Sequence, residues 1–196
     1  MEKPTYLLKS TPNALQHIFE SVKNDVVIPK IVVYLPTENN PNLYQLVFGN
    51  LMPNGEIDTL SVSNNDDMRI VLTTVVKTLF SFFELNPDKV VIFTGSTLSR
   101  TRLYRAVISK FINETELFYE IKDITENGVL EKFQSNQTYL GYLSNLKMKN
   151  KTQQISNGNG HIITNDMPFV NLDSPHIKEQ VQKVNEILKK IKTPFI

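Results

Sequence analysis

The sequence has 196 residues, 40% of them hydrophobic, which is enough for one domain with a sizeable core. Its 21 lysines and arginines nearly balance its 20 aspartates and glutamates, so no overall basic field favours nucleic acid or an anionic membrane. The absence of cysteine excludes disulfides, thiolate metal sites and a cysteine nucleophile.

Strand patterns fill the first third of the chain. Residues 17–22 and 26–36 flank a polar turn and predict two strands, and Pro29 favours an edge position or a bulge for the second. Residues 42–50 and 56–64 predict two more strands, joined by a tight turn. Because residues 42–50 carry apolar side chains on both faces, we expect that strand inside the sheet.

Helices and strands alternate in the middle of the chain. Between residues 67 and 83 the apolar period becomes about 3.6, which predicts the central helix of the core. Residues 89–95 are nearly all apolar and predict a buried strand in parallel pairing. A second helix is expected from Ser99, a strand at 117–124, and a short polar helix that ends near residue 151.

The composition divides the chain into three parts. Residues 1–150 form the predicted single domain. Residues 151–173 are rich in Ser, Asn, Gly and Pro, which predicts a flexible linker. Residues 174–192 predict a C-terminal amphipathic helix, with Ser174 as its cap and Pro175 as its first residue.

The core of this succession, taken as three antiparallel strands, helix, strand, helix, strand, predicts an α/β (α+β) fold with a mixed, mainly antiparallel sheet in the order β-β-β-α-β-α-β, followed by the C-terminal helix. Two large fold groups share the order, the RNase H-like nucleases and the GNAT-type N-acetyltransferases. Such a nuclease needs carboxylates on its core strands to hold divalent metal, but residues 30–36 and 89–95 contain none. The three histidines also lack metal-ligand spacing, so we expect no metal site.

The stretch GSTLSRTRLYR, at the junction of a strand and a helix, is the main candidate binding site. The hydroxyls of Ser96 and Thr97 and the free amides of the helix start favour a phosphate or carboxylate ligand. Arg100 and Arg102, with Arg105 one turn further, supply positive charge. Alternatively, the hydroxyls cap the helix and the arginines pair with carboxylates of the protein. Both interpretations are open.

A second polar group precedes the central helix. Asn64, Asn65, Asp66 and Asp67 are expected to face the arginines across the neighbouring strand ends and to add ligand contacts. Alternatively, these residues form an ordinary turn, with Asn65 or Asp66 as the helix cap, since short polar side chains are the usual cap formers.

The segment SRTRLY, residues 99–104, resembles the helix that follows the fourth core strand in GNAT-type N-acetyltransferases. The resemblance implies that Tyr104 acts as a general acid. That family binds the pyrophosphate of acetyl-CoA with a glycine-rich turn at a helix start. This chain has SNNDDMR there, whose two aspartates repel a pyrophosphate, so we expect no cofactor.

Several segments between residues 14 and 146 recur in one order: HIFESV, IPKIVVY, LVFGN, GEIDTLSVSNNDD, VLTTVVKTLFSFFE, GSTLSRTRLYR and YLGYL. Together they resemble a family of uncharacterised proteins, a domain of unknown function typical of Bacteroidetes bacteria. The resemblance implies no particular activity.

We therefore expect a non-catalytic binding or interaction module that binds a small anionic ligand or a protein partner, including a second copy of itself. The alternatives are a diverged GNAT-type acyltransferase and a nucleic-acid-binding protein that uses the arginines locally. The N-terminal residues lack the pattern of a signal peptide, and no apolar run is long enough to span a bilayer. We expect a cytoplasmic protein that does not interact with membranes.

Overall fold

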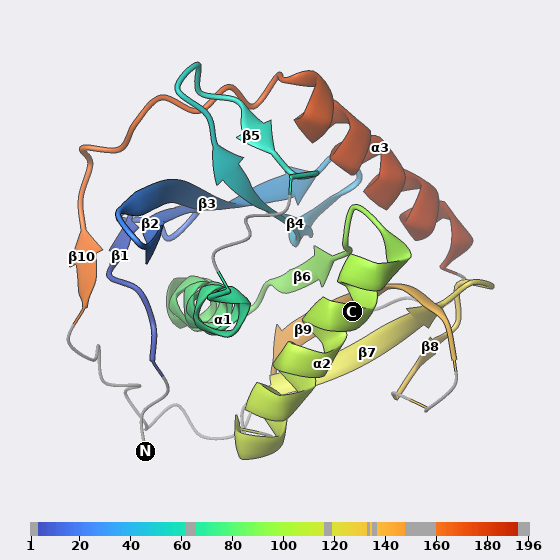
Figure 1. Ribbon diagram of the computed structural model, residues 1–196. Helices are drawn as coiled ribbons and strands as arrows, with labels where there is room; N and C mark the ends of the chain where they lie inside the picture. Colours follow the sequence, from blue (N-terminus) through green and yellow to red (C-terminus); the bar gives the residue numbers. More distant parts are fainter. Residues whose placement is uncertain are drawn as a thin grey trace.

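The structure is a computed structural model that describes residues 4–61, 66–115, 119–132, 134, 137–147 and 160–191, with the backbone alone for 107–115. The described residues form one ten-stranded sheet and three helices (Figure 1). The strands are β1 (Leu8–Ser10), β2 (Gln16–Lys23), β3 (Val26–Thr37), β4 (Asn40–Leu51), β5 (Ile57–Asp58), β6 (Val90–Phe93), β7 (Tyr119–Thr125), β8 (Leu130–Glu131), β9 (Tyr139–Leu146) and β10 (His161–Ile163). The helices are α1 (Met68–Leu85), α2 (Leu98–Thr115) and α3 (Pro175–Lys190).

The sheet is mixed and mostly antiparallel, as predicted. Its strand order is β10-β1-β2-β3-β4-β6-β9-β7-β8, and β5 pairs with the end of β4. Two pairings are parallel, β4 with β6 and β1 with β10, and the others are antiparallel. The α+β class is therefore confirmed.

Two predictions of secondary structure need correction, one of a helix and one of a strand. The prediction of a short polar helix before residue 151 is wrong, because residues 139–146 form β9 between β6 and β7. Because β9 lies between two other strands, it buries even polar residues such as Ser144. Its sequence therefore lacks the alternation of apolar and polar residues by which a half-buried strand is recognised. The strand expected at 56–64 is limited to Ile57–Asp58 within the described residues.

Pro29 lies in the part of β3 that pairs only with β2. The pairing of β3 with β4 starts at Lys30 and Asn50, so β3 is an edge at Pro29 and becomes an inner strand one residue later. This position suits a residue that has no amide hydrogen to donate.

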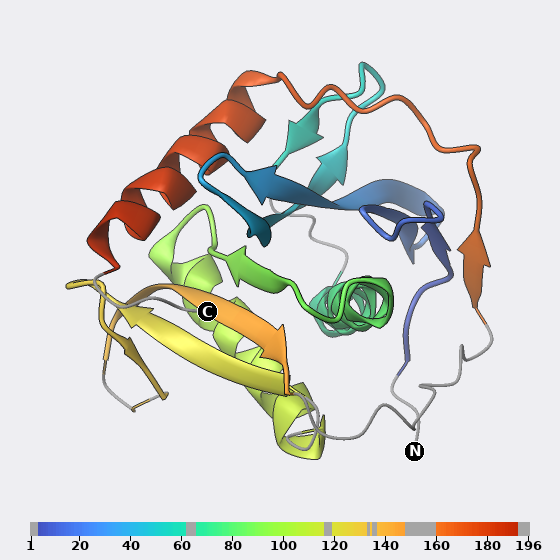
Figure 2. The same ribbon diagram turned by 180° about the vertical axis from the view of Figure 1, so that it is seen from behind.

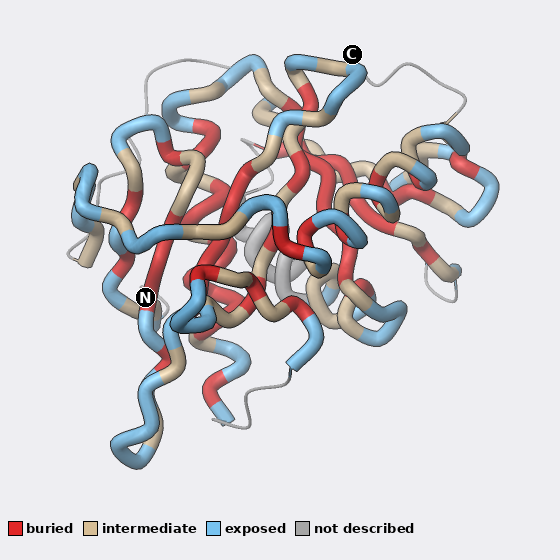
Figure 3. Tube along the Cα trace, turned by 90° about the horizontal axis from the view of Figure 1, so that it is seen from above, coloured by how far each residue is buried: buried red, intermediate tan, exposed pale blue. Residues whose placement is uncertain are grey.

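The helices lie on both faces of the sheet. α1 and α2 cover one face, and the sheet curls around α1, whereas α3 crosses the opposite face (Figures 1 and 2). The aromatic core between α1 and the sheet includes Phe82 of α1, whose ring stacks on that of Tyr34 of β3 with 4.3 Å between centroids. Figure 3 shows buried residues along the central strands and exposed residues at the loops. The main core thus lies between α1, α2 and the sheet.

The face opposite α1 is covered by the C-terminal part of the chain. The tail residues Ile177 and Val181 pack against a cluster that contains Ile31, Val47 and Ile57. Further along α3, buried side chains pack on a second cluster from β4, β6, β7 and β9: Leu43, Val90, Ile92, Ile124 and Leu143, with Val184 and Ile187 from the helix. The third layer of the fold is therefore α3.

Residues 160–173 run along the sheet before α3 begins. β10 pairs in parallel with β1, from Leu8 opposite His161 to Ser10 opposite Ile163. The amide of Thr164 continues the contact by donating to the carbonyl of Ser10 at 2.8 Å. The first nine residues of the expected linker lie outside the described residues, and the division into domain, linker and tail helix stays a prediction.

A buried hydrogen-bonded chain joins β10 to β1 and β2. Nε2 of His17 lies 2.9 Å from the carbonyl of Ala14, and because a carbonyl only accepts, Nε2 carries the proton. Nδ1 of His17 then accepts from the hydroxyl of Ser10 at 2.6 Å, and this oxygen accepts from Nε2 of His161 at 2.7 Å. Burial lowers the pKa of His17 to about 3, so its imidazole is neutral at pH 7.

Candidate functional site

The parallel strands β4 and β6 pair over only three positions. Leu43, Tyr44 and Gln45 lie opposite Val90, Val91 and Ile92. The next four residues of β4, 46–49, pair with β3 alone, and β5 joins at Asn50. The carboxyl ends of the two strands thus separate at one edge, the place where open sheets commonly bind ligands.

Two small cavities lie at this separation. The first, called the apolar chamber, has a volume of about 40 Å³. The second, called the polar chamber, has a volume of about 60 Å³. The apolar chamber is lined by Leu46, Val47, Phe48, Thr59, Leu72, Val75, Val76, Phe93, Thr94, Ser96, Tyr104 and Gln180. The polar chamber is lined by Lys30, Phe48, Gly49, Asn50, Asp58, Thr59, Ser61, Asp67, Met68, Val71, Arg100, Leu103 and Tyr104. Because Phe48, Thr59 and Tyr104 line both, the chambers adjoin.

Three polar side chains border the apolar chamber without an internal partner. The hydroxyls of Thr59 and Tyr104 and the carboxamide of Gln180 form no hydrogen bond with any residue that the structure describes. Burial raises the pKa of Tyr104 above its ordinary value, so the phenol is neutral. A mainly apolar pocket with a few converging polar groups is the usual form of a small-molecule site.

Arg100 closes the end of the site near the β5–α1 connection. Its Nη1 donates to the carbonyl of Thr59 and, at 2.6 Å, to the hydroxyl of Ser96. Its Nη2 donates to the carbonyls of Leu60 and, at 3.1 Å, of Ser61. These acceptors are all neutral, and no carboxylate of the described residues lies within ion-pair distance of Arg100. Its positive charge is therefore not cancelled by direct pairing.

The polar chamber has a second cation, Lys30, which is only 3% exposed. Its Nζ donates to Oδ1 of Asn50, the residue opposite it on β4, at 2.6 Å. Burial lowers the pKa of Lys30, and the negative charge of Asp67 opposes this shift. Oδ2 of Asp67 in turn accepts from the hydroxyls of Tyr6 and Ser21, each at 2.6 Å. The chamber thus holds both signs of charge.

The predicted residues at the start of α2 lie together. The Ser96 hydroxyl donates to the carbonyl of Thr59 at 3.1 Å, and the Thr97 hydroxyl accepts from the amide of Arg100 at 3.2 Å, as a helix cap does. Arg102, by contrast, is exposed and lines neither chamber. Within this stretch the cavities are lined by Ser96, Arg100, Leu103 and Tyr104, and the anion site built on it stays a prediction.

Gly95 explains how the end of β6 meets α2. A Cβ added to Gly95 would lie 2.4 Å from the amide nitrogen of Thr101, which is impossible without movement of the helix. The amide of Gly95 also donates to the Thr101 hydroxyl at 3.0 Å. The glycine therefore allows the close approach that sets the start of α2 beside the chambers.

The second predicted polar group is described at Asp66 and at Asp67, which lines the polar chamber. Asn64 and Asn65 lie outside the described residues, and Asp66 is exposed and forms an ion pair with Lys23. The N-cap of α1 is Asp67, whose side chain makes no capping hydrogen bond. Neither expected cap residue, Asn65 or Asp66, thus occupies the cap position.

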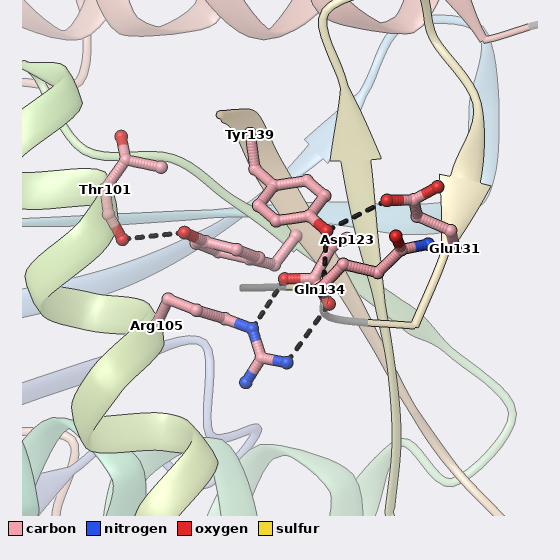
Figure 4. Close-up of polar contacts among 7 residues, drawn as sticks. Thr101, Arg105, Asp123, Glu131, Gln134 and Tyr139 are labelled. Atoms are coloured by element: carbon pink, nitrogen blue, oxygen red, sulfur yellow. Dashed lines mark hydrogen bonds and ion pairs between the residues drawn. The ribbon is translucent and has the colours of Figure 1, made fainter. Parts of the chain in front are cut away.

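Arg105 points away from the chambers toward β7. Its Nε donates to Oδ1 of Asp123 at 2.5 Å and its Nη2 to Oδ2 at 3.2 Å, and its guanidinium carbon lies 5.8 Å from the centre of the Tyr142 ring (Figure 4). Asp123 is fully buried. Burial raises the pKa of its carboxyl, whereas the bonds from Arg105 lower it. The pair anchors α2 to the sheet.

The remaining contacts in Figure 4 join β9 to the end of β8 and to α2. The Tyr139 hydroxyl donates to Oε1 of Glu131 at 2.9 Å and accepts from the amide of Gln134 at 2.8 Å. The Tyr142 hydroxyl donates to the carbonyl of Thr101 at 2.9 Å. These bonds connect β8, β9 and α2, so this cluster serves the fold.

Fold and site together define an α+β protein with a small pocket where two parallel strands separate. The chain belongs to DUF6934, a family of unknown function, whose sequence model matches residues 2–147. This confirms the resemblance to a domain of unknown function; an origin in Bacteroidetes stays a prediction. Comparisons with curated proteins and with solved structures gave no significant match. Among the described helices, none combines the length and apolar character needed to cross a membrane.

Proposed function

We propose that this protein binds a small amphiphilic anion. The anionic group lies beside Arg100, and the apolar part occupies the apolar chamber. The observation that carries the proposal is the guanidinium of Arg100, which has only neutral acceptors in the described part of the chain and lines the chamber next to an apolar cavity. A guanidinium in this setting favours a carboxylate or phosphate.

The volume of the apolar chamber limits the size of the ligand. At about 40 Å³ it is large enough for roughly three water-sized groups, taking about 10–15 Å³ for each. A straight chain of a few carbons fits this space and would contact Leu46, Phe48 and Phe93. Short-chain carboxylates are therefore suitable first probes.

The proposal predicts that butanoate binds and that its neutral isostere, butan-1-ol, binds more weakly. Replacing Arg100 by Gln should weaken butanoate binding by about 10- to 100-fold, because a hydrogen bond to a charged group contributes about 1.5–3 kcal/mol. Isothermal titration calorimetry measures the affinity. Arg100→Lys, which keeps the charge but not the planar fork, should be intermediate.

Arg102→Gln is the matched control, since Arg102 lies two positions further along α2 and is exposed. It removes the same charge from the same helix and should leave the affinity within a factor of about two. Equal butanoate affinity in the Arg100→Gln variant and the wild-type protein would show that the Arg100 charge holds the loop after β5 and binds no anion.

A second candidate function, the diverged GNAT-type acyltransferase, is favoured by two observations. The core order β2-β3-β4-α1-β6-α2-β7 agrees with the order on which that resemblance rests. Tyr104, the residue that the resemblance implies as general acid, borders both chambers, and its hydroxyl has no partner among the described residues. A neutral phenol in a cavity is able to donate a proton.

The two candidates differ in their response to acetyl-CoA. We expect acetyl-CoA to leave the melting temperature unchanged, because SNNDDMR lacks glycine and places two aspartates before α1. Differential scanning fluorimetry over a concentration series measures this. A dose-dependent increase, with turnover but not binding lost in Tyr104→Phe, would make the protein an enzyme.

The nucleic-acid alternative gains no support from the arginines. Of the three in GSTLSRTRLYR, Arg100 and Arg105 bond to protein groups, and only Arg102 is exposed. One exposed arginine does not supply the several phosphate contacts of such an interface.

A further inference from the structure

Gln180 is a buried carboxamide on the face of α3 that contacts the sheet. It is 7% exposed and borders the apolar chamber, although α3 lies on the opposite face of the sheet from α1 and α2. The chamber therefore extends through the separation of β4 and β6 and ends at α3. Gln180 also lies outside residues 2–147, so the tail contributes a wall to a site that the family region otherwise forms.

The side chain of Gln180 makes no hydrogen bond with any described residue. A carboxamide has two donor hydrogens and an acceptor oxygen, all able to bind a ligand. Among the described residues, the fully enclosed side-chain atoms without a partner are the hydroxyl oxygens of Ser144 and Ser174, so the carboxamide of Gln180 remains accessible. Docking of α3 does not require it, because Lys183 donates to the carbonyl of Gly95 at 2.6 Å and Ile177 and Val184 are buried on either side. Within the described part of the chain, no hydrogen-bond partner thus explains a polar residue at position 180.

We infer that Gln180 binds a polar group at the far end of the ligand. This inference rests on the proposed function and names its ligand class more closely: a short bifunctional molecule with an anionic group at one end and a hydroxyl or amide at the other. The anionic group lies beside Arg100, and the second group meets the carboxamide of Gln180, with the hydroxyls of Thr59 and Tyr104 on the wall between.

A series of four-carbon acids tests the inference by calorimetry. The wild-type protein should bind 4-hydroxybutanoate and succinamate about 2- to 10-fold more tightly than butanoate, as expected for one added hydrogen bond of about 0.5–1.5 kcal/mol. The Gln180→Leu variant should lose this preference and still bind butanoate. If the preference persists in Gln180→Leu, or if the wild-type protein shows none, Gln180 does not recognise the ligand.

Stability without ligand gives an independent readout. Gln180→Leu should raise the denaturation midpoint of the free protein, because the variant replaces a polar side chain that has no described hydrogen-bond partner by an apolar one on a mainly apolar wall. Gln182→Leu is the control on the same helix, since Gln182 is exposed, and should change the midpoint little. A midpoint lowered by Gln180→Leu would overturn the inference by revealing a structural role. If no acid binds the wild-type protein, the proposed function fails and the inference with it.

Discussion

Replacing Asp123 by Ala should lower the free energy of unfolding by about 3–5 kcal/mol, the usual cost of removing one partner from a buried ion pair. The guanidinium of Arg105 would then remain between α2 and β7 without the carboxylate that accepts its Nε and Nη2 protons. Urea denaturation followed by circular dichroism measures the change, and this is the largest single effect that we expect.

Glu120→Ala is the matched control for this prediction. Glu120 lies on the same strand and pairs with Lys122 at 4.0 Å, but both side chains are about 40% exposed, so the change should stay within about 1 kcal/mol. A double variant, Arg105→Leu with Asp123→Leu, should recover much of the loss, since both charges are removed together. Equal destabilisation by Asp123→Ala and Glu120→Ala would contradict the structural role of the pair.

Acid should destabilise the protein through His17. An unfolded chain protonates this imidazole near its ordinary pKa of about 6.5, whereas burial lowers the native pKa to about 3. The unfolded state thus binds a proton that the native state excludes, so stability is present above pH 6.5 and is lost as the pH falls. Between pH 7 and pH 4 the loss from His17 should be about 3 kcal/mol.

The His17→Gln variant isolates this effect. Glutamine keeps a donor and an acceptor for Ala14 and Ser10 but does not titrate, so its free energy of unfolding should fall less steeply with acid. His161, whose pKa burial also lowers, contributes a second part, and His161→Gln should remove it. Parallel pH profiles for the wild-type protein and His17→Gln would assign the acid sensitivity to other groups.

The elements predicted well from the sequence are those with a long local pattern. The 3.6-residue period placed the central helix at 67–83, and the structure has α1 at Met68–Leu85. β9 was missed because Ser144 and Asn145 interrupt its apolar run, and burial between β6 and β7 is a tertiary effect. β10 has only three residues, and its partner β1 lies far away in the sequence, so no local pattern predicts this strand.

The candidate site was predictable only where its residues are close in sequence. Ser96 and Arg100 were expected together and bond to each other. Their partners are the backbone carbonyls of residues 59–61, which come from another part of the chain. Every residue has a backbone carbonyl, so the sequence does not indicate which of them accept these bonds.

Two further residues carried signals that only the fold makes interpretable. Lys30 is a lysine within an apolar strand run, and Gln180 lies at helical spacing between the apolar Ile177 and Val184. In each case a polar residue at an apolar position marks the site. Such interruptions are also common on solvent-facing surfaces, so only three-dimensional contacts identify these two.

The position of α3 as the third layer has a consequence for synthesis on the ribosome. The segment that covers Ile31, Val47 and Ile57 is translated after the rest of the sheet, since the family region ends at residue 147 and the described tail at 191. At about 5–20 residues per second, this interval lasts roughly 2 to 9 s. During it the nascent sheet presents an uncovered apolar face, which is the kind of surface that chaperones bind. Docking of α3 after its synthesis therefore ends the exposure of that face and protects it from aggregation.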